Sequence, residues 1–289
     1  MKKALILSIL PLLFCLQLNA GGPWPTGKGN AYIKLSEWWT VFDQHFTDQG
    51  FKDPNLTTGL YNTSLYVEYG LGDRFTAIFN APILSRNFMN NLVSATNFEV
   101  IVPGEAINTF GDIEIGGKYN LTKPGAKFPI AATLTLGIPT GVAVGGTQGN
   151  LQTGDGEFNQ ILQIDAGTGF SLGAASGYVS GYAGINNRSK GFSEEFRYGL
   201  EVGVGLINNR FYLSGKLNAV ESFRNGDTAA SVTSTSIFGN NSEFVTLGIE
   251  ANVYITEKFG VSAGFTNVTS GEIFAAAPSY SVGVFLDIK

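Results

Sequence analysis

Residues 111–121 read GDIEIGGKYNL, and their side chains alternate between two kinds. The odd-numbered positions hold apolar, aromatic or small residues: Ile113, Ile115, Gly117, Tyr119 and Leu121. The even-numbered positions hold charged, polar or small residues: Asp112, Glu114, Gly116, Lys118 and Asn120. Successive side chains of a β-strand point to opposite faces, so this stretch predicts a strand with one apolar and one polar face.

The same period of two recurs along the chain, most clearly at 198–206 and 245–255. In the seventh segment the tyrosines Tyr178 and Tyr182 compete with Val179 and Ala183 for the outer face, so its faces stay open. We expect strands at 30–42, 58–71, 75–86, 111–121, 129–139, 158–172, 177–187, 195–206, 210–221, 243–256, 259–268 and 278–288.

The connections between these segments alternate in length. Tight turns at 72–74, 207–209 and 256–258 alternate with long polar loops at 43–57, 87–110, 140–157 and 222–242. Short periplasmic turns and long extracellular loops are typical of outer-membrane barrels. An even number of strands puts both chain ends on the periplasmic side.

Two folds produce such alternation, a soluble β-sandwich and a membrane barrel. Lipid offers the backbone no hydrogen bonds, so a membrane sheet must close on itself. Segments of ten or more residues, and aromatic residues at their ends, favour the barrel: Tyr69, Phe75, Phe211 and Phe259. We therefore predict an all-β protein, a single transmembrane antiparallel up-and-down β-barrel of about 12 strands in the outer membrane.

The composition agrees with a bilayer as solvent. Of 289 residues 14% are charged and 38 are glycine, and the net charge of −5 argues against nucleic acid as a partner. The expected partner is outer-membrane lipid, and the oligomeric state stays open. Many glycines fall on the predicted lumen face, where they either relieve crowding or leave a passage.

The first twenty residues have a different pattern. Lys2 and Lys3 precede an apolar stretch over 4–16, and Leu18-Asn19-Ala20 ends it with a small residue. This predicts a cleaved signal peptide, residues 1–20, followed by one barrel domain, residues 21–289. Since the only cysteine lies in that peptide, the mature chain uses no disulfides.

Charges of both signs fall on the predicted lumen face. Either they form a selectivity ring that lines a water-filled channel, or they pair in a salt-bridge network that fills a small barrel. Glu37 has the lipid-facing parity, which suggests a bulge, a position near a loop or a shifted register. The lumen candidates are Lys34, Glu68, Asp112, Glu114, Lys118, Asp165, Arg197, Glu201, Lys216 and Glu250.

No catalytic site, metal site or cofactor is expected. His45 is the only histidine, it falls in the first predicted loop, and no G-x-S-x-G motif accompanies it. Asp155 and Glu157 flank a loop glycine, but two acids are too few for a calcium site. An outer-membrane enzyme is therefore the least favoured class.

The middle of the chain resembles a known family. Residues 111–119 (GDIEIGGKY), 136–141 (LGIPTG) and 153–156 (TGDG), preceded by Phe79-Asn80-Ala81-Pro82, resemble the outer-membrane barrels named after the meta-pathway of phenol degradation. The resemblance spans roughly residues 65–205. It implies passive uptake of small, aromatic or hydrophobic molecules. Its turn and rim positions in this chain are Gly111, Asp112, Pro139, Thr140 and Gly141.

The expected function is therefore a passive channel for small molecules. The alternative is a plugged structural barrel without transport, whose long loops bind a partner. The sequence leaves open whether the 87–110 loop folds inward as a constriction.

Overall fold

The computed structural model describes residues 21–173, 175–227, 230 and 237–289, so the predicted signal peptide lies outside the described residues. Within these ranges twelve long strands form one sheet. They are β1 (Ala31–Phe46), β2 (Lys52–Gly70), β3 (Phe75–Met89), β7 (Ile113–Asn120), β8 (Ile130–Ile138), β9 (Asn159–Leu172), β10 (Ala175–Arg188), β11 (Glu195–Leu206), β12 (Phe211–Ser222), β13 (Glu243–Tyr254), β14 (Phe259–Glu272) and β16 (Ser279–Ile288).

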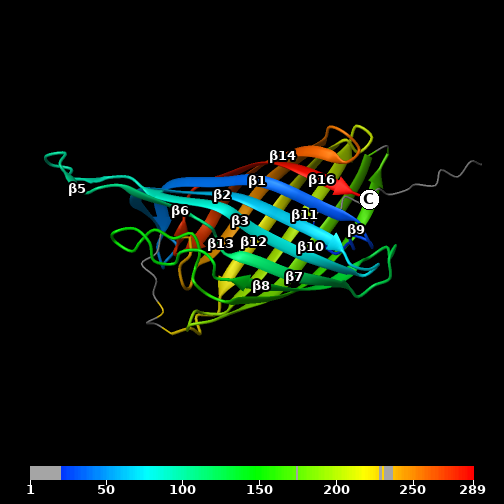
Figure 1. The fold of residues 1–289 in the computed structure, drawn as a ribbon, viewed down its shortest axis with the longest axis horizontal. Helices are drawn as coiled ribbons and strands as arrows, with labels where there is room; N and C mark the ends of the chain where they lie inside the picture. The colour runs from blue at the N-terminus through cyan, green and yellow to red at the C-terminus, as the bar shows by residue number, and fades with distance from the viewer. Residues whose placement is uncertain (1–20, 174, 228–229, 231–236) are drawn as a thin grey trace, which may run out of the picture.

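The sheet closes into a barrel through β1 (Figure 1). Each long strand pairs antiparallel with the next along the chain, and β1 pairs with both β2 and β16. Ala31, for example, lies opposite Tyr69 on one side and Ile288 on the other. The predicted twelve-stranded up-and-down barrel is therefore confirmed.

The two ends of the barrel differ, as the loop lengths predict. Residues 71–74, 207–210 and 255–258 make short connections at the end that also holds the C-terminus, which we call the tight-turn end. The opposite, long-loop end carries the connections after β3, β8 and β12. In the described part of the chain, no helix is long and apolar enough to cross a membrane.

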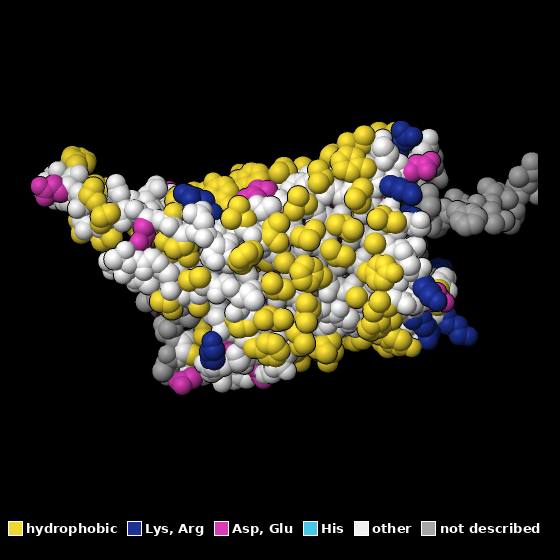
Figure 2. All heavy atoms as spheres, in the orientation of Figure 1, with side chains coloured by type: hydrophobic (Ala, Val, Ile, Leu, Met, Phe, Trp, Pro, Cys, Tyr) yellow, Lys and Arg dark blue, Asp and Glu magenta, His cyan; other side chains and the backbone are white. Residues whose placement is uncertain are grey.

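The outer wall is apolar. Figure 2 shows hydrophobic side chains over most of the visible wall, with most charged side chains near the two ends. Leu134, Leu162 and Ile249 are 50%, 59% and 58% exposed. Such exposure would be unfavourable in water, but an outward apolar band is what a lipid bilayer requires.

The first predicted loop is largely strand, which corrects the sequence-based expectation for 43–57. β1 continues to Phe46 and β2 begins at Lys52, with His45 opposite Asp53 beyond a bulge between Phe42 and Gln44. Pro54 pairs with β1 only, because the pairing of β2 with β3 begins later, at Thr58. A proline, which has no N–H to donate, is tolerated at such an edge position. His45 is thus a half-buried strand residue and not an exposed loop residue.

The 87–110 segment also contains strands that the sequence did not indicate. β3 runs on to Met89, β6 (Glu105–Thr109) pairs with it, and β4 (Leu92–Val93) pairs with β5 (Val100–Val102). A further short strand, β15 (Phe274–Ala275), pairs with the end of β1. The β4–β5 hairpin projects away from the barrel, so its tip does not narrow the lumen (Figure 1).

The faces of β10 are decided by its neighbour. Tyr178 lies opposite Gly203 and Tyr182 opposite Gly199, and both rings lie on the lumen side. A Cβ at Gly203 would lie 2.2 Å from Cε1 of Tyr178, and one at Gly199 would lie 2.3 Å from Cε1 of Tyr182. These lumen glycines therefore make room for tyrosine rings.

Glu37 keeps the outward parity that the sequence gives it. It lies within β1, opposite Thr63 and Val282, without a bulge in β1 at that point. The Thr63 hydroxyl donates a 2.5 Å hydrogen bond to its carboxylate. The expected bulge, loop or shifted register at Glu37 is therefore wrong, and a neighbouring hydroxyl partly satisfies the outward charge.

We predict that Gly199→Ala destabilises the barrel by about 1–3 kcal/mol, the usual cost of overpacking. The new methyl group would press on the Tyr182 ring and on the Leu217 carbonyl oxygen, 2.8 Å away. The control is Gly215→Ala, because a Cβ at Gly215 meets nothing within 4 Å. Urea unfolding in detergent checks both variants, and equal midpoints for Gly199→Ala and wild type would contradict the crowding argument.

Candidate functional site

The lumen holds the candidate functional site. The structure positions the ten predicted charged residues on the inner face of the barrel or at its long-loop rim. Each of the four cations, Lys34, Lys118, Arg197 and Lys216, has an acidic partner within 4.0 Å. Eight of the ten belong to three groups, and Asp112 and Glu114 line the same cavity as the third group.

The central cluster consists of Lys34, Glu201, Lys216 and Glu250. Lys216 Nζ lies 2.7 Å from Glu250 Oε2 and 3.7 Å from Glu201 Oε2. Lys34 Nζ lies 2.9 Å from Glu250 Oε1, although β14 and β16 separate β1 from β13 in the sheet. Two cations and two carboxylates thus balance one another inside the barrel.

The Glu68 cluster lies nearer the tight-turn end and consists of Glu68, Lys118 and Asp165. Lys118 Nζ lies 3.4 Å from Glu68 Oε2, and both side chains are buried. Tyr66 also donates a 2.6 Å hydrogen bond to Glu68. Asp165 accepts from Gln163 at 2.8 Å and from Thr133 at 3.4 Å, so every carboxylate here is held by defined donors.

Residues 21–26, which we call the N-terminal segment, fill part of the lumen, and sequence reasoning missed them. Thr26 donates from its hydroxyl to Glu68 at 2.9 Å and from its backbone N–H to Thr76 at 3.2 Å. Lys118 donates to the carbonyl of Gly22 at 3.2 Å, and Asn120 donates to that of Pro23. A segment without regular structure is tolerated at this depth because the wall satisfies its backbone groups.

The N-terminal segment crosses the lumen. Trp24 is buried and meets Tyr178 of β10 edge-on, with ring centroids 5.6 Å apart. β2 and β10 stand nearly opposite each other in the strand order. The only sequence signal was a short run, Pro23-Trp24-Pro25, whose aromatic residue has no strand to belong to.

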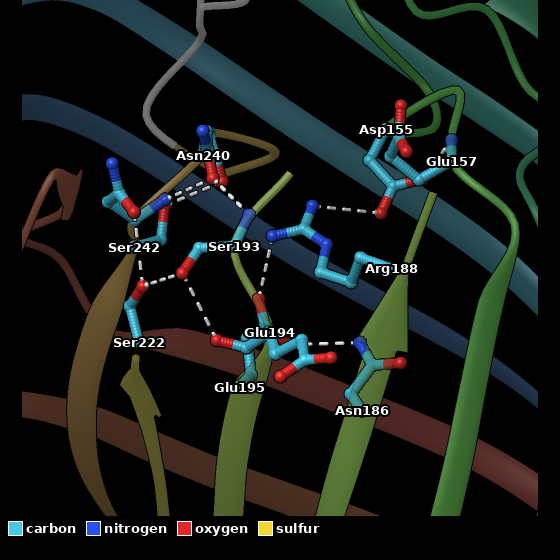
Figure 3. A network of polar contacts seen from close by, with 12 residues as sticks. Asp155, Glu157, Asn186, Arg188, Ser193, Glu194, Glu195, Ser222, Asn240 and Ser242 are labelled. Carbon is cyan, nitrogen blue, oxygen red and sulfur yellow. Dashed lines mark hydrogen bonds and ion pairs between the residues drawn. The ribbon is translucent and has the colours of Figure 1, made fainter. Parts of the chain in front are cut away.

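A third group, the rim network, lies at the long-loop end (Figure 3). Arg188 bridges Glu195 at 2.8 Å and Asp155 at 3.2 Å, and Asn186 donates to Glu195 at 3.1 Å. Arg197 lies 2.7 Å from the other oxygen of Glu195. Sequence reasoning identified Arg197 alone, although Glu195 shares its parity on β11.

The turn and rim residues of the family resemblance meet in one place, which we call the motif knot. Gly141 and Asp155 donate backbone N–H groups to the two oxygens of Asp112 at 2.8 and 2.9 Å. Thr140, which follows Pro139 at the end of β8, donates to the carbonyl of Gly111 at 2.7 Å. The motif therefore fixes the loop between β8 and β9 to the start of β7.

Three cavities are stacked along the lumen. The cavity nearest the tight-turn end, about 280 Å³, is lined by Trp24 and several tyrosines, and we call it the lowest cavity. It shares Glu201 and Lys216 with a middle cavity of about 200 Å³. The upper cavity, about 260 Å³, is lined by the rim network and by Glu114, which accepts a hydrogen bond from Asn80. On β12, Asn218 lines the middle cavity and Val220 lines the upper one. These two residues are about 7 Å apart along the strand.

Comparison with solved structures identifies the fold. The COG4313 outer membrane channel from Pseudomonas putida F1 matches with a TM-score of 0.58 and 15% identity, over 94% of this chain and 100% of that chain. The chain has the fold of an outer-membrane β-barrel. LpxR from Salmonella typhimurium matches with a TM-score of 0.50 and 9% identity, over 88% and 99% of the two chains. A NanC porin matches with a TM-score of 0.49 and 8% identity, over 89% and 99%.

At the level of sequence, no family model and no curated protein matches this chain. The predicted outer-membrane barrel is confirmed in its fold, which the COG4313 channel and LpxR share. The finer resemblance to the meta-pathway barrels stays a prediction.

We predict that the motif knot opens more readily as the pH rises through about 6. Asp112 precedes β7, outside the membrane-spanning strands, and burial raises its pKa to about 6, with the nearby Asp155 adding to the effect. Because this pKa lies above the ordinary value of an exposed Asp, the closed knot binds the proton more tightly than the open one, and protonation stabilises the closed state.

Hydrogen exchange of the Gly141 and Asp155 amides, corrected for intrinsic rates, checks this prediction. Corrected exchange in wild type should slow as the pH falls from about 7 to 5. In Asp112→Asn this pH dependence should be lost, since an amide does not titrate in this range. Wild-type exchange that is independent of pH between 5 and 8 would contradict the prediction.

Proposed function

We propose that the protein is a passive outer-membrane channel for small molecules, exported by a signal peptide, residues 1–20, that is then removed. The observation that carries this proposal is the stack of three cavities along the barrel axis. A solute that crosses the barrel would pass them in order from the long-loop end to the tight-turn end. The long-loop end faces the outside of the cell, and the tight-turn end faces the periplasm.

The lining of the cavities suggests the class of solute. The lowest cavity has the rings of Trp24, Tyr32, Tyr178, Tyr212 and Tyr254 around it. Volumes of about 200–280 Å³ suit a small molecule and not a chain of sugars. We infer a small solute with an aromatic or hydrophobic part, in line with the family resemblance, and paired lumen charges give it only weak charge selection.

A plugged barrel without transport is the second candidate. It is favoured by the N-terminal segment, in which Pro23 and Trp24 are buried, and by the pairing of every lumen cation. In that case the lumen charges stabilise the barrel and the long loops bind a partner. An enzyme is less well supported, because Nδ1 of His45 has no hydrogen-bond partner among the described residues.

We predict conductance steps, or solute-driven swelling of liposomes, when the purified protein is reconstituted. Arg197→Gln and Glu201→Gln should shift the reversal potential in a salt gradient in opposite directions, with little change in the unfolding midpoint. Both side chains are partly exposed in the lumen, at 32% and 29%, so a mobile ion senses their charge.

The matched control is Glu221→Gln, which removes a charge that faces outside the barrel on β12. It should leave the reversal potential unchanged. The channel proposal would be contradicted if bilayers showed no conductance with many solutes and the lumen variants only lost stability. Those results would favour the plugged barrel.

A further inference from the structure

We propose that removal of the signal peptide after Ala20 creates a lumen cation, because the new α-ammonium group of Gly21 binds the carboxylate of Glu68. The inference rests on the cleavage proposed above and is independent of transport. The mature N-terminus would thus belong to the Glu68 cluster, and cleavage of the signal peptide would add the last charge of that cluster.

The geometry for this ion pair is present. The backbone nitrogen of Gly21 lies 3.0 Å from Glu68 Oε1 and donates a hydrogen bond to it. Tyr66 donates to the same oxygen, and Thr26 and Lys118 approach Oε2. Four donors, two of them from the N-terminal segment, therefore hold the carboxylate, and Glu68 itself is 0% exposed.

The charge balance of the Glu68 cluster calls for a further cation. Lys118 supplies one positive charge, whereas Glu68 and Asp165 supply two negative charges, and Lys118 acts electrostatically on both carboxylates. The three side chains are buried, at 2%, 0% and 4% exposure. A buried unpaired charge is strongly unfavourable, so an α-ammonium that cancels the excess carboxylate would stabilise this arrangement.

Cleavage supplies that charge by ordinary hydrolysis. A signal peptidase adds water across the Ala20–Gly21 peptide bond: the carbonyl carbon of Ala20 gains the hydroxyl, the C–N bond breaks, and the nitrogen of Gly21 leaves as an amine. An α-amino group has an ordinary pKa of about 7.7–8.0, so near neutral pH it takes up a proton. The neutral amide donor becomes a charged donor at the same position.

The barrel wall leaves space for the docked terminus. A Cβ at Gly70 would clash with the carbonyl of Gly27, and one at Gly167 would lie 3.0 Å from Cγ of Pro23. Gly21 and Gly22 have φ values of 81° and 73°, which side chains rarely adopt. Small residues on both sides thus let the chain reach Glu68.

Two measurements on the intact exported protein test the inference. The first is the mass of the mature chain, which should begin at Gly21; any other first residue overturns the proposal. The second is the rate at which an acylating reagent modifies the α-amino group near neutral pH. Labelling should be about tenfold or more slower in the folded barrel than in urea, since a buried paired ammonium is a poor nucleophile.

Variants make the second measurement specific. Glu68→Gln should restore fast labelling of the folded protein, whereas Glu221→Gln should leave the protection unchanged. A glycine inserted between Gly21 and Gly22 keeps the cleavage site and every lumen side chain but moves the ammonium by about 3.5 Å, so it should also restore fast labelling.

The insertion keeps the test decisive if Glu68→Gln fails to fold. Equal labelling of folded and unfolded wild type, or full protection in the folded insertion variant, would overturn the ion pair. Neither measurement involves transport, so a silent channel would refute the proposed function and leave this inference standing.

Discussion

Closure of the backbone hydrogen-bond network is the constraint on which the rest of this structure depends. In lipid an unpaired strand edge has no partner, so β1 must pair on both sides. Residues 31–40 do so, with β2 on one side and β16 on the other. Closure sends one parity of every strand to lipid and the other to the lumen, which sets the apolar outside and the charged inside together.

Closure also creates a packing problem inside. Several charges of the inner face, such as Glu68, Lys118 and Asp165, are shielded from bulk water and so need partners. The structure solves this by pairing: Lys34 and Lys216 share Glu250, and Lys118 reaches Glu68. Glycine solves the steric part, since Gly199 and Gly203 accept tyrosine rings from the neighbouring strand. Charge pairing and ring packing occupy the same wall, so the lumen is narrow.

The sequence predicts what is local and misses what depends on contacts between distant residues. All twelve barrel strands, and the lumen parity of residues such as Lys118 and Glu250, follow from alternation, because side-chain direction is set by the strand itself. The sequence did not indicate the extension of β1 past residue 42, because the residues there are mostly polar. Such residues form a strand when a partner strand is present, as β2 is here. The faces of β10 depend on the glycines of β11, and that register is a property of the folded sheet.

The candidate site shows the same division. The charged residues were found by parity, but which of them pair was not, and Arg188 and Glu195 of the rim network were missed. Arg188 lies one residue past the expected end of its strand, and Asp155 belongs to a loop that folds back over the rim. The N-terminal segment was missed for a different reason. It has no periodicity, and only the positions of Glu68, Thr76 and Tyr178 in the closed barrel give it a binding surface.

The two ends of the lumen are consequently built from different interactions. At the long-loop end Arg197 and Arg224, which follows β12, are partly exposed. Glu195, the partner of Arg197, is buried, whereas Glu243, the partner of Arg224, is partly exposed. At the tight-turn end Glu68 and Lys118 are buried and tied to the N-terminal segment, beside aromatic rings. Exposed pairs exchange with water and ions at little cost, whereas buried ones do not. In the proposed channel, a solute that enters at the long-loop end would therefore meet a polar rim with partly exposed arginines first and an aromatic cavity last.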